Sequence, residues 1–275
     1  LPMLPNPINP TFKDILHLNM FKYSQREPTF SLNKRRLRSY HLDHVLLAAG
    51  PSGQKVTQMT FFNSVYESYD WQASLIALLA IAILTKLLKQ GIFKHPEANA
   101  MKQRNHELDK KKLAQEKYPL VIKDTQRAGL YTNLTFFLLI LPFCITSDAG
   151  EPLNILLNVV LILMIYDFFY YLMHRFWFHG TGPMRQIHAI HHQARTPTYI
   201  DAHYVHPIET FLGLTLFFLT IGGLSLFTGP FDIISIVCVY IIYVQLNILN
   251  HTSINKASFP FKTIHWIAAK HHRHH

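Results

Sequence analysis

Five long apolar runs, almost free of charged residues, dominate the pattern of hydrophobic and polar positions along the chain. They cover residues 73–88, 130–145, 153–173, 208–228 and 231–249. Several of them approach the roughly 20 residues that an α-helix needs to cross the hydrocarbon core of a bilayer. The pattern therefore predicts an all-α, multi-pass integral membrane protein with four to five transmembrane helices. The run at 73–88 is the weakest candidate, because it is about one turn short of a normal span.

Short connections pair the last four runs into two helical hairpins. Residues 146–152 and 228–230 contain the glycine and proline that are typical of tight links between helices. The segment 89–127 carries ten Lys or Arg residues against five Asp or Glu, and basic loops stay on the cytoplasmic side of a membrane. Threading the hairpins from this segment places residues 174–206 and 251–275 on the same cytoplasmic face, where they are expected to form a histidine-rich helical cap.

Composition and charge agree with a membrane location. Hydrophobic residues make up 49% of the chain and charged residues only 15%, against roughly 25% charged residues in soluble domains. The net charge of the chain is +10, and its basic residues cluster beside the predicted spans. This position favours binding to anionic lipid headgroups or to an acidic protein partner over binding to nucleic acid. Cys144 and Cys238 fall inside apolar runs, so no disulfide framework is expected.

The chain has eighteen histidines, and most of them lie where the predicted spans meet the cytoplasm. An H-x2-H-H box occurs twice, first as His188, His191 and His192 and then as His271, His274 and His275. Residues at i, i+3 and i+4 share one face of an α-helix. Each box is therefore expected to converge on one point.

Three further histidines complete a candidate ligand set. His174 and His179 lie about 140° apart on an ideal helix, so they share a face only if the helix loosens there, and otherwise each serves a different metal. His251 lies at the exit of the fifth run. Imidazole suits zinc, copper, iron and nickel. Nine imidazoles are too many for one ion, and they predict a pair of metal ions with open coordination positions.

Three residues are candidates to support these ligands. Asp167 lies inside an apolar run, where a carboxylate is costly and marks a functional site by default. We expect it to fix the tautomer of a histidine from another cluster, with a structural bond to a Tyr or Trp as the alternative. His206 begins the fourth run, facing either the metal site or the headgroups. Asn247 lies one turn before His251 and is expected to orient it or to hold a water. Glu209 is expected only to complement the helix dipole.

The order of the histidine boxes resembles that of the fatty acid hydroxylase/sterol desaturase superfamily. The sequences DFFYYLMHRFWFH, around the first box, and AHYVHPIE, after the second, are similar to that family as well. The resemblance covers residues 153–275 and implies a helical membrane fold whose cytosolic cap holds two iron ions. We expect the chain to have three parts: an N-terminal segment 1–70 with no assigned role, a first helix and basic loop at 71–128, and a membrane di-iron oxygenase domain at 129–275.

The resemblance also implies the chemistry. Family members are oxidoreductases that use O2 to hydroxylate, demethylate or desaturate a lipid or sterol at a C–H bond. Such enzymes need an external electron donor, such as a b-type cytochrome or a reductase, and the basic cytosolic loop at Lys110–Lys112 is the expected docking surface. The membrane is expected to be the endoplasmic reticulum in a eukaryote and the inner membrane in a bacterium.

Other classes of function stay open at this point. A zinc-dependent membrane hydrolase could use the same histidines, and zinc often binds more tightly than ferrous iron, so it can occupy the purified protein. Hydrolases of the H-E-x-x-H type, however, carry a glutamate base inside the motif, and no box here contains a carboxylate. A transporter would place ionisable residues near mid-membrane on several spans. A haem-binding protein needs only two axial histidines and leaves the others without a role.

Overall fold

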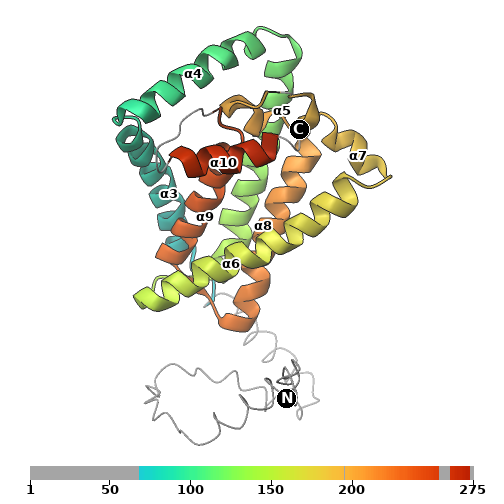
Figure 1. Ribbon diagram of the computed structural model, residues 1–275. Helices are drawn as coiled ribbons and strands as arrows, with labels where there is room; N and C mark the ends of the chain where they lie inside the picture. Colours follow the sequence, from blue (N-terminus) through green and yellow to red (C-terminus); the bar gives the residue numbers. More distant parts are fainter. Residues whose placement is uncertain (1–67, 195, 254–260, 273–275) are drawn as a thin grey trace, which may run out of the picture. The chain divides into compact units, whose positions relative to one another are not determined.

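The structure, a computed structural model, describes residues 68–194, 196–253 and 261–272 (Figure 1). Its α-helices are α3 (Trp71–Ile92), α4 (Pro96–Leu113), α5 (Lys117–Thr135), α6 (Pro152–Met173), α7 (Pro183–His188), α8 (Pro207–Thr228), α9 (Ile233–Asn250) and α10 (Phe261–His272). The all-α prediction is confirmed. The N-terminal segment, apart from its last residues, lies outside the described residues, and so do His274 and His275.

Among the described residues, four helices are long and apolar enough to cross a membrane: α3, α6 with its extension to Phe178, α8 and α9. The shortest apolar run belongs to one of them. Helix α3 reaches 22 residues because it begins at Trp71, directly after the capping residue Asp70, and continues past Lys89 to Ile92. Long basic side chains near a helix end extend to the headgroups, so a charge such as Lys89 does not prevent this helix from spanning.

The apolar run at 130–145 does not form a helix of its own. It is the end of α5, which starts in polar sequence and continues as the π-helix η2 (Phe136–Ile140) and the 3-10 helix η3 (Leu141–Phe143). Pro142 lies within η3, and proline cannot continue an α-helix because it lacks a backbone N–H. This run is not among the candidate spans of the described residues. Instead its Phe136 and Phe137 are buried in the main hydrophobic core.

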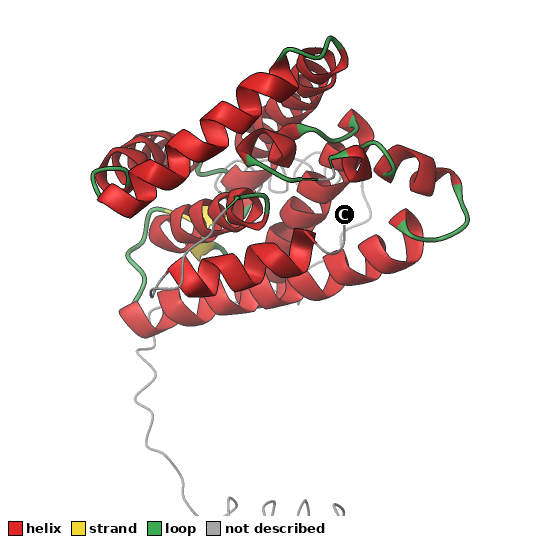
Figure 2. Cartoon of the chain, turned by 45° about the horizontal axis from the view of Figure 1, so that its top comes forward, coloured by secondary structure: helices red, strands yellow, loops and turns green. Residues whose placement is uncertain are grey.

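Both predicted hairpin links lie at one end of the helix bundle. Strand β1 (Ile145–Thr146) pairs in parallel with strand β2 (Phe231–Asp232), the only strand pairing in the part of the chain that the structure describes (Figure 2). Gly229 has φ of 83° in the α8–α9 link, a conformation that glycine adopts without strain. Asp70 accepts a hydrogen bond from Ser147 Oγ at 2.9 Å. The start of α3 therefore lies at this end too.

The core of the bundle is aromatic. Phe136 stacks on Phe218 of α8 with ring centroids 3.8 Å apart, and Phe217 stacks on Tyr243 of α9 at 4.3 Å. Helix α5 packs along α8, while α6 packs against both α8 and α9. Helices α4, α7 and α10 gather at the end opposite the β1–β2 pairing (Figure 1). The basic segment and the histidine boxes therefore share one end of the bundle, as predicted.

Candidate metal centre

Two groups of histidine side chains converge in the cap. The first cluster consists of His174, His179 and His188, and the second cluster of His191, His251 and His271. Within each cluster the candidate ligand nitrogens all lie within 4.8 Å of one another. His192 belongs beside the first cluster, because its Nε2 lies 2.8 Å from that of His188. Seven of the nine predicted ligands thus converge, and His274 and His275 stay predictions.

The spacing of the nitrogens fits metal coordination. The Nε2 atoms of His174 and His179 are 3.2 Å apart in the first cluster. In the second cluster, His251 Nε2 lies 3.2 Å from His191 Nε2 and 3.0 Å from His271 Nε2. Two nitrogens bound at right angles to one ion, each at the roughly 2.1 Å typical of zinc–histidine bonds, are about 3.0 Å apart. Each cluster therefore fits one metal ion.

A π-helix brings the first two ligands together. The helix α6 continues as η4 (His174–Phe178), and the N–H of His179 donates to the carbonyl of His174 at 3.1 Å. Hydrogen bonds from residue i to i+5 define the wider π turn, which is common at functional sites. The helix loosens at the required place, so residues five apart share a face. Gly180 follows directly, where an added Cβ would lie 2.3 Å from the carbonyl oxygen of Phe176.

The chemical state of His179 suits a ligand. Burial lowers the pKa of this imidazole, and the nearby His188 and Arg185 lower it further. A lower pKa keeps the ring neutral over a wider pH range. Only the neutral ring offers a lone pair to a metal.

The second box divides between the two clusters, so the prediction that it converges on one point is wrong. Helix α7 ends at His188, a turn follows, and the chain then forms the short 3-10 helix η5 (His191–Gln193). The i, i+3, i+4 argument assumes an uninterrupted α-helix. The break turns His191 toward His251, while His188 and His192 stay with the first cluster.

Oxygen acceptors hold the other nitrogen of three ligands. His188 Nδ1 lies 2.8 Å from a carboxylate oxygen of Glu209, and His251 Nδ1 lies 2.8 Å from the backbone carbonyl oxygen of Asn247. His191 Nδ1 lies 3.3 Å from the carbonyl oxygen of Tyr204. A proton held on Nδ1 by such an acceptor leaves the Nε2 lone pair directed at the metal.

Glu209 is the residue that the sequence argument missed. It is buried, and in the described residues its second carboxylate oxygen has no hydrogen-bond partner. Its position carried a usable signal, because it is a carboxylate inside an apolar helix, the same criterion that singled out Asp167. Because a carboxylate near the start of α8 already complements the helix dipole, the contact of Glu209 with His188 was not predicted.

The three predicted supporting residues have different surroundings. Asp167 is exposed on α6 and makes no hydrogen bond to any of the described histidines. His206 caps α8, since its Nδ1 accepts the N–H of Ile208 at 3.1 Å, and it belongs to neither cluster. Asn247 lies beside His251, but the contact comes from its backbone carbonyl and does not depend on the asparagine side chain.

Comparisons with known proteins agree with this geometry. Residues 159–275 match the family model described as fatty acid hydroxylase, a range that includes every described member of both clusters. A protein of Dictyostelium discoideum named as a methylsterol monooxygenase is 36% identical over 77 residues, which are 28% of this chain and 25% of that protein. No solved structure matches the chain.

The histidine-bearing part of the chain therefore belongs to the fatty acid hydroxylase/sterol desaturase superfamily, as the order of its boxes predicted. The alignment spans about a quarter of the length of the relative. The basic helix α4 lies before the matched residues.

Proposed function

We propose that this protein is a membrane-bound di-iron oxidoreductase that uses O2 to hydroxylate or desaturate a C–H bond of a lipid or sterol. The observation that carries the proposal is the presence of two adjoining histidine clusters in a fatty acid hydroxylase domain. The clusters adjoin closely, because the rings of His188 and His191 have centroids 5.7 Å apart. These residues would hold two metal ions side by side.

The chain's own residues hold and shield such a centre. Iron, when bound, supplies the redox chemistry that activates O2. The histidines present Nε2 atoms to the ions, and Glu209 together with two backbone carbonyls keeps the rings in the required tautomer. His174 directly follows α6 and His251 directly follows α9, and both helices are long and apolar enough to span a membrane. The centre therefore adjoins the bilayer in which an apolar substrate chain would lie.

The first test is the metal content of the detergent-purified protein, measured together with O2-dependent conversion of lipids and sterols. We expect on the order of two iron ions per chain and an oxidised lipid product. His106→Ala is a suitable control, because His106 is exposed and belongs to neither cluster, and it should retain the metal. Bound zinc with no O2 uptake, even after reconstitution with ferrous iron, would favour the hydrolase and overturn the proposal.

Electrons for this reaction must come from outside the chain. We propose that an acidic donor, such as a b-type cytochrome, docks on the exposed basic side of α4. Lys110 and Lys111 are exposed there, whereas Lys112 points inward and forms an ion pair with buried Asp201. Of the docking surface expected from the sequence, the first two lysines are thus available to a partner. In a eukaryotic cell we place the protein in the endoplasmic reticulum, which fluorescence microscopy of a tagged chain tests.

Charge reversal at Lys111 is expected to weaken the donor interaction alone. Lys111→Glu should raise the KM for an acidic donor by about 5-fold at low ionic strength, and the effect should shrink as salt screens the charges. Turnover supported by a small chemical reductant serves as the control and should not change. An unaltered KM for the donor at low salt would show that α4 is not the docking surface.

A further inference from the structure

The second cluster takes its three ligands from three separate segments of the chain. His191 comes from η5, His251 follows the end of α9, and His271 lies on α10. No single element therefore sets their convergence. Helix α4 contacts the neighbourhood of each of these segments, although it lies outside the residues that match the family.

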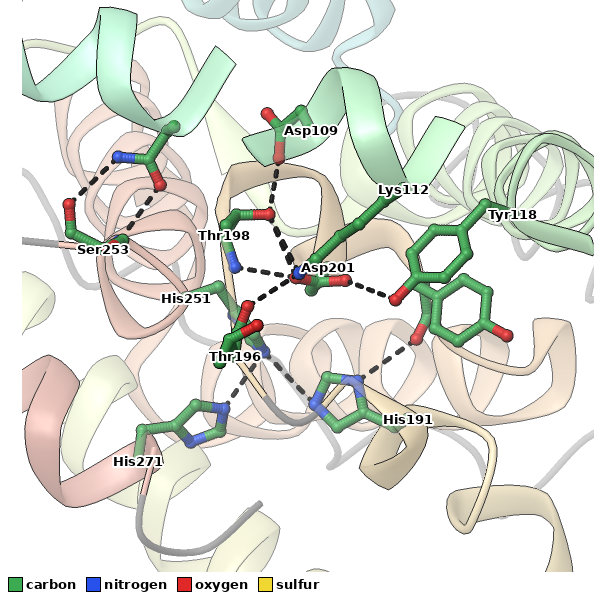
Figure 3. A network of polar contacts seen from close by, with 12 residues as sticks. Asp109, Lys112, Tyr118, His191, Thr196, Thr198, Asp201, His251, Ser253 and His271 are labelled. Carbon is green, nitrogen blue, oxygen red and sulfur yellow. Dashed lines mark hydrogen bonds and ion pairs between the residues drawn. The ribbon is translucent and has the colours of Figure 1, made fainter. Parts of the chain in front are cut away.

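Lys112 connects α4 to the segment that follows His191. Its ammonium donates to the carbonyl oxygen of Thr196 at 2.7 Å and to the hydroxyl of Thr198 at 3.2 Å, and it pairs with the carboxylate of Asp201 (Figure 3). Asp201 is completely buried, and a buried carboxylate is stable only when paired and hydrogen-bonded. Asp109, also on α4, accepts a hydrogen bond from Thr198. The segment 196–201 is thus fastened to α4 by polar contacts.

The fastened segment in turn reaches His191. Asp201 accepts a hydrogen bond from the hydroxyl of Tyr118 at 3.3 Å, and the Tyr118 ring stacks on Tyr204 with centroids 3.9 Å apart. Burial and the Asp201 carboxylate raise the pKa of Tyr118, so its hydroxyl stays a donor. The carbonyl of Tyr204 is the group that faces His191 Nδ1. Contacts therefore run without a break from Lys112 to a ligand.

Asn105 fastens the segment that follows His251. Its side chain is completely buried on α4. The amide oxygen accepts the N–H of Ser253 at 3.0 Å, and the amide nitrogen donates to the carbonyl oxygen of Ser253 at 3.1 Å. This two-bond contact fixes the backbone two residues after the ligand.

The start of α10 also rests on α4. Phe261 is buried against Ala98 of α4, and His95, the residue that precedes α4, has its ring centroid 5.6 Å from that of Phe261. Phe261 begins the helix that carries His271. Its position on α4 therefore sets where that helix begins relative to the other two ligands.

We infer that α4 positions the second metal site, with Asn105 and Lys112 as its positioning residues. The inference rests on the proposed function, because it takes the second cluster to bind a metal ion. The first cluster is built differently: its ligands lie on the extension of α6 and on α7, and Glu209 of α8 orients His188. Loosening α4 therefore disturbs one metal ion and leaves the other in place.

The test measures bound iron in the full chain after brief exposure to a chelator. Asn105→Ala and Lys112→Met are the test variants. Asn99→Ala and Lys111→Met are matched controls, because both residues are exposed on the same helix. We expect the test variants to lose about half of the iron, since groups that orient ligands contribute about 10- to 100-fold in metal affinity, while the controls retain the wild-type content.

Two ligand variants show which ion is lost. In a His251→Ala background, whose second cluster is already broken, Asn105→Ala should cause no further loss. In a His179→Ala background it should remove the remaining iron. Wild-type iron content in Asn105→Ala, or equal loss from both backgrounds, would overturn the inference. If Asn105→Ala does not fold, Asn105→Asp, which keeps the acceptor for Ser253 N–H, is judged by the same comparison. A wild-type protein that binds no iron would instead overturn the proposed function.

Discussion

Replacing His251 with alanine is expected to lower O2-dependent product formation by at least about 100-fold, because losing a ligand costs no less than losing a group that orients one. His251 is the central member of the second cluster, with its Nε2 within 3.2 Å of the Nε2 atoms of both His191 and His271. Without it, two imidazoles remain to hold the ion among the described residues. The bound iron should fall by about half, because the first cluster keeps its own ligands.

Iron content and product formation, measured on the same preparation, check this prediction. His106→Ala is the matched control, because His106 is exposed on α4 and lies outside both clusters. Its iron content and product formation should equal those of the wild type. A His251→Ala protein that keeps both its iron and its activity would show that the second cluster is not part of the centre.

Replacing Glu209 with glutamine is expected to weaken iron binding at the first cluster by about 10- to 100-fold. The amide oxygen of the introduced glutamine could still accept the proton of His188 Nδ1, so the ring would keep its orientation. The substitution removes the negative charge of Glu209, and it is this charge that makes His188 a more basic ligand for the metal. Glu209→Ala should weaken binding further, because it also leaves the buried Nδ1–H of His188 without its acceptor.

Although Glu209→Gln is expected to lower the affinity for iron, it should not lower the thermal stability of the metal-free protein. A buried carboxylate with one oxygen lacking a hydrogen-bond partner is costly to fold around. The metal-free Glu209→Gln protein is therefore expected to melt at a temperature equal to or above that of the metal-free wild type. A chelator titration gives the affinity and a thermal melt gives the stability, with the exposed Glu116→Gln as control. Unchanged affinity for iron would show that Glu209 only fills space beside His188.

Sequence periodicity was sufficient for four of the five apolar runs, which form helices of spanning length, because such runs have few alternatives to a helix in a bilayer. It was not sufficient for the run at 130–145, which completes α5 and lies in the core. The histidine boxes, together with His251 at the exit of the fifth run, also identified seven histidines that converge. The sequence was less informative where the backbone departs from an ideal α-helix. The five-residue spacing of His174 and His179 allows convergence only on a looser helix, and the spacing of the second box placed His191 in the wrong cluster because the chain breaks after α7. Both departures lie at the metal centre, where local rules are most often broken.

Tertiary contacts account for the other differences. Asp167 and Glu209 are both carboxylates in apolar helices, and only the packing of α7 against α8 decides which of them meets a histidine. Likewise, three consecutive lysines at 110–112 look equivalent in the sequence. A helix directs consecutive residues about 100° apart, so Lys112 turns inward to Asp201 while Lys111 remains exposed.

If each cluster holds a metal ion, as proposed, the division of the second box also limits the distance between the two ions. His188 and His191 serve different clusters, yet only Ala189 and Ile190 separate them. Three residue steps span at most about 11 Å even when fully extended, and here they are coiled. The separation of the ions is therefore set by a two-residue spacer. A substrate can change the shape of the surrounding helices, but it cannot draw the two ions far apart without removing a ligand from one of them.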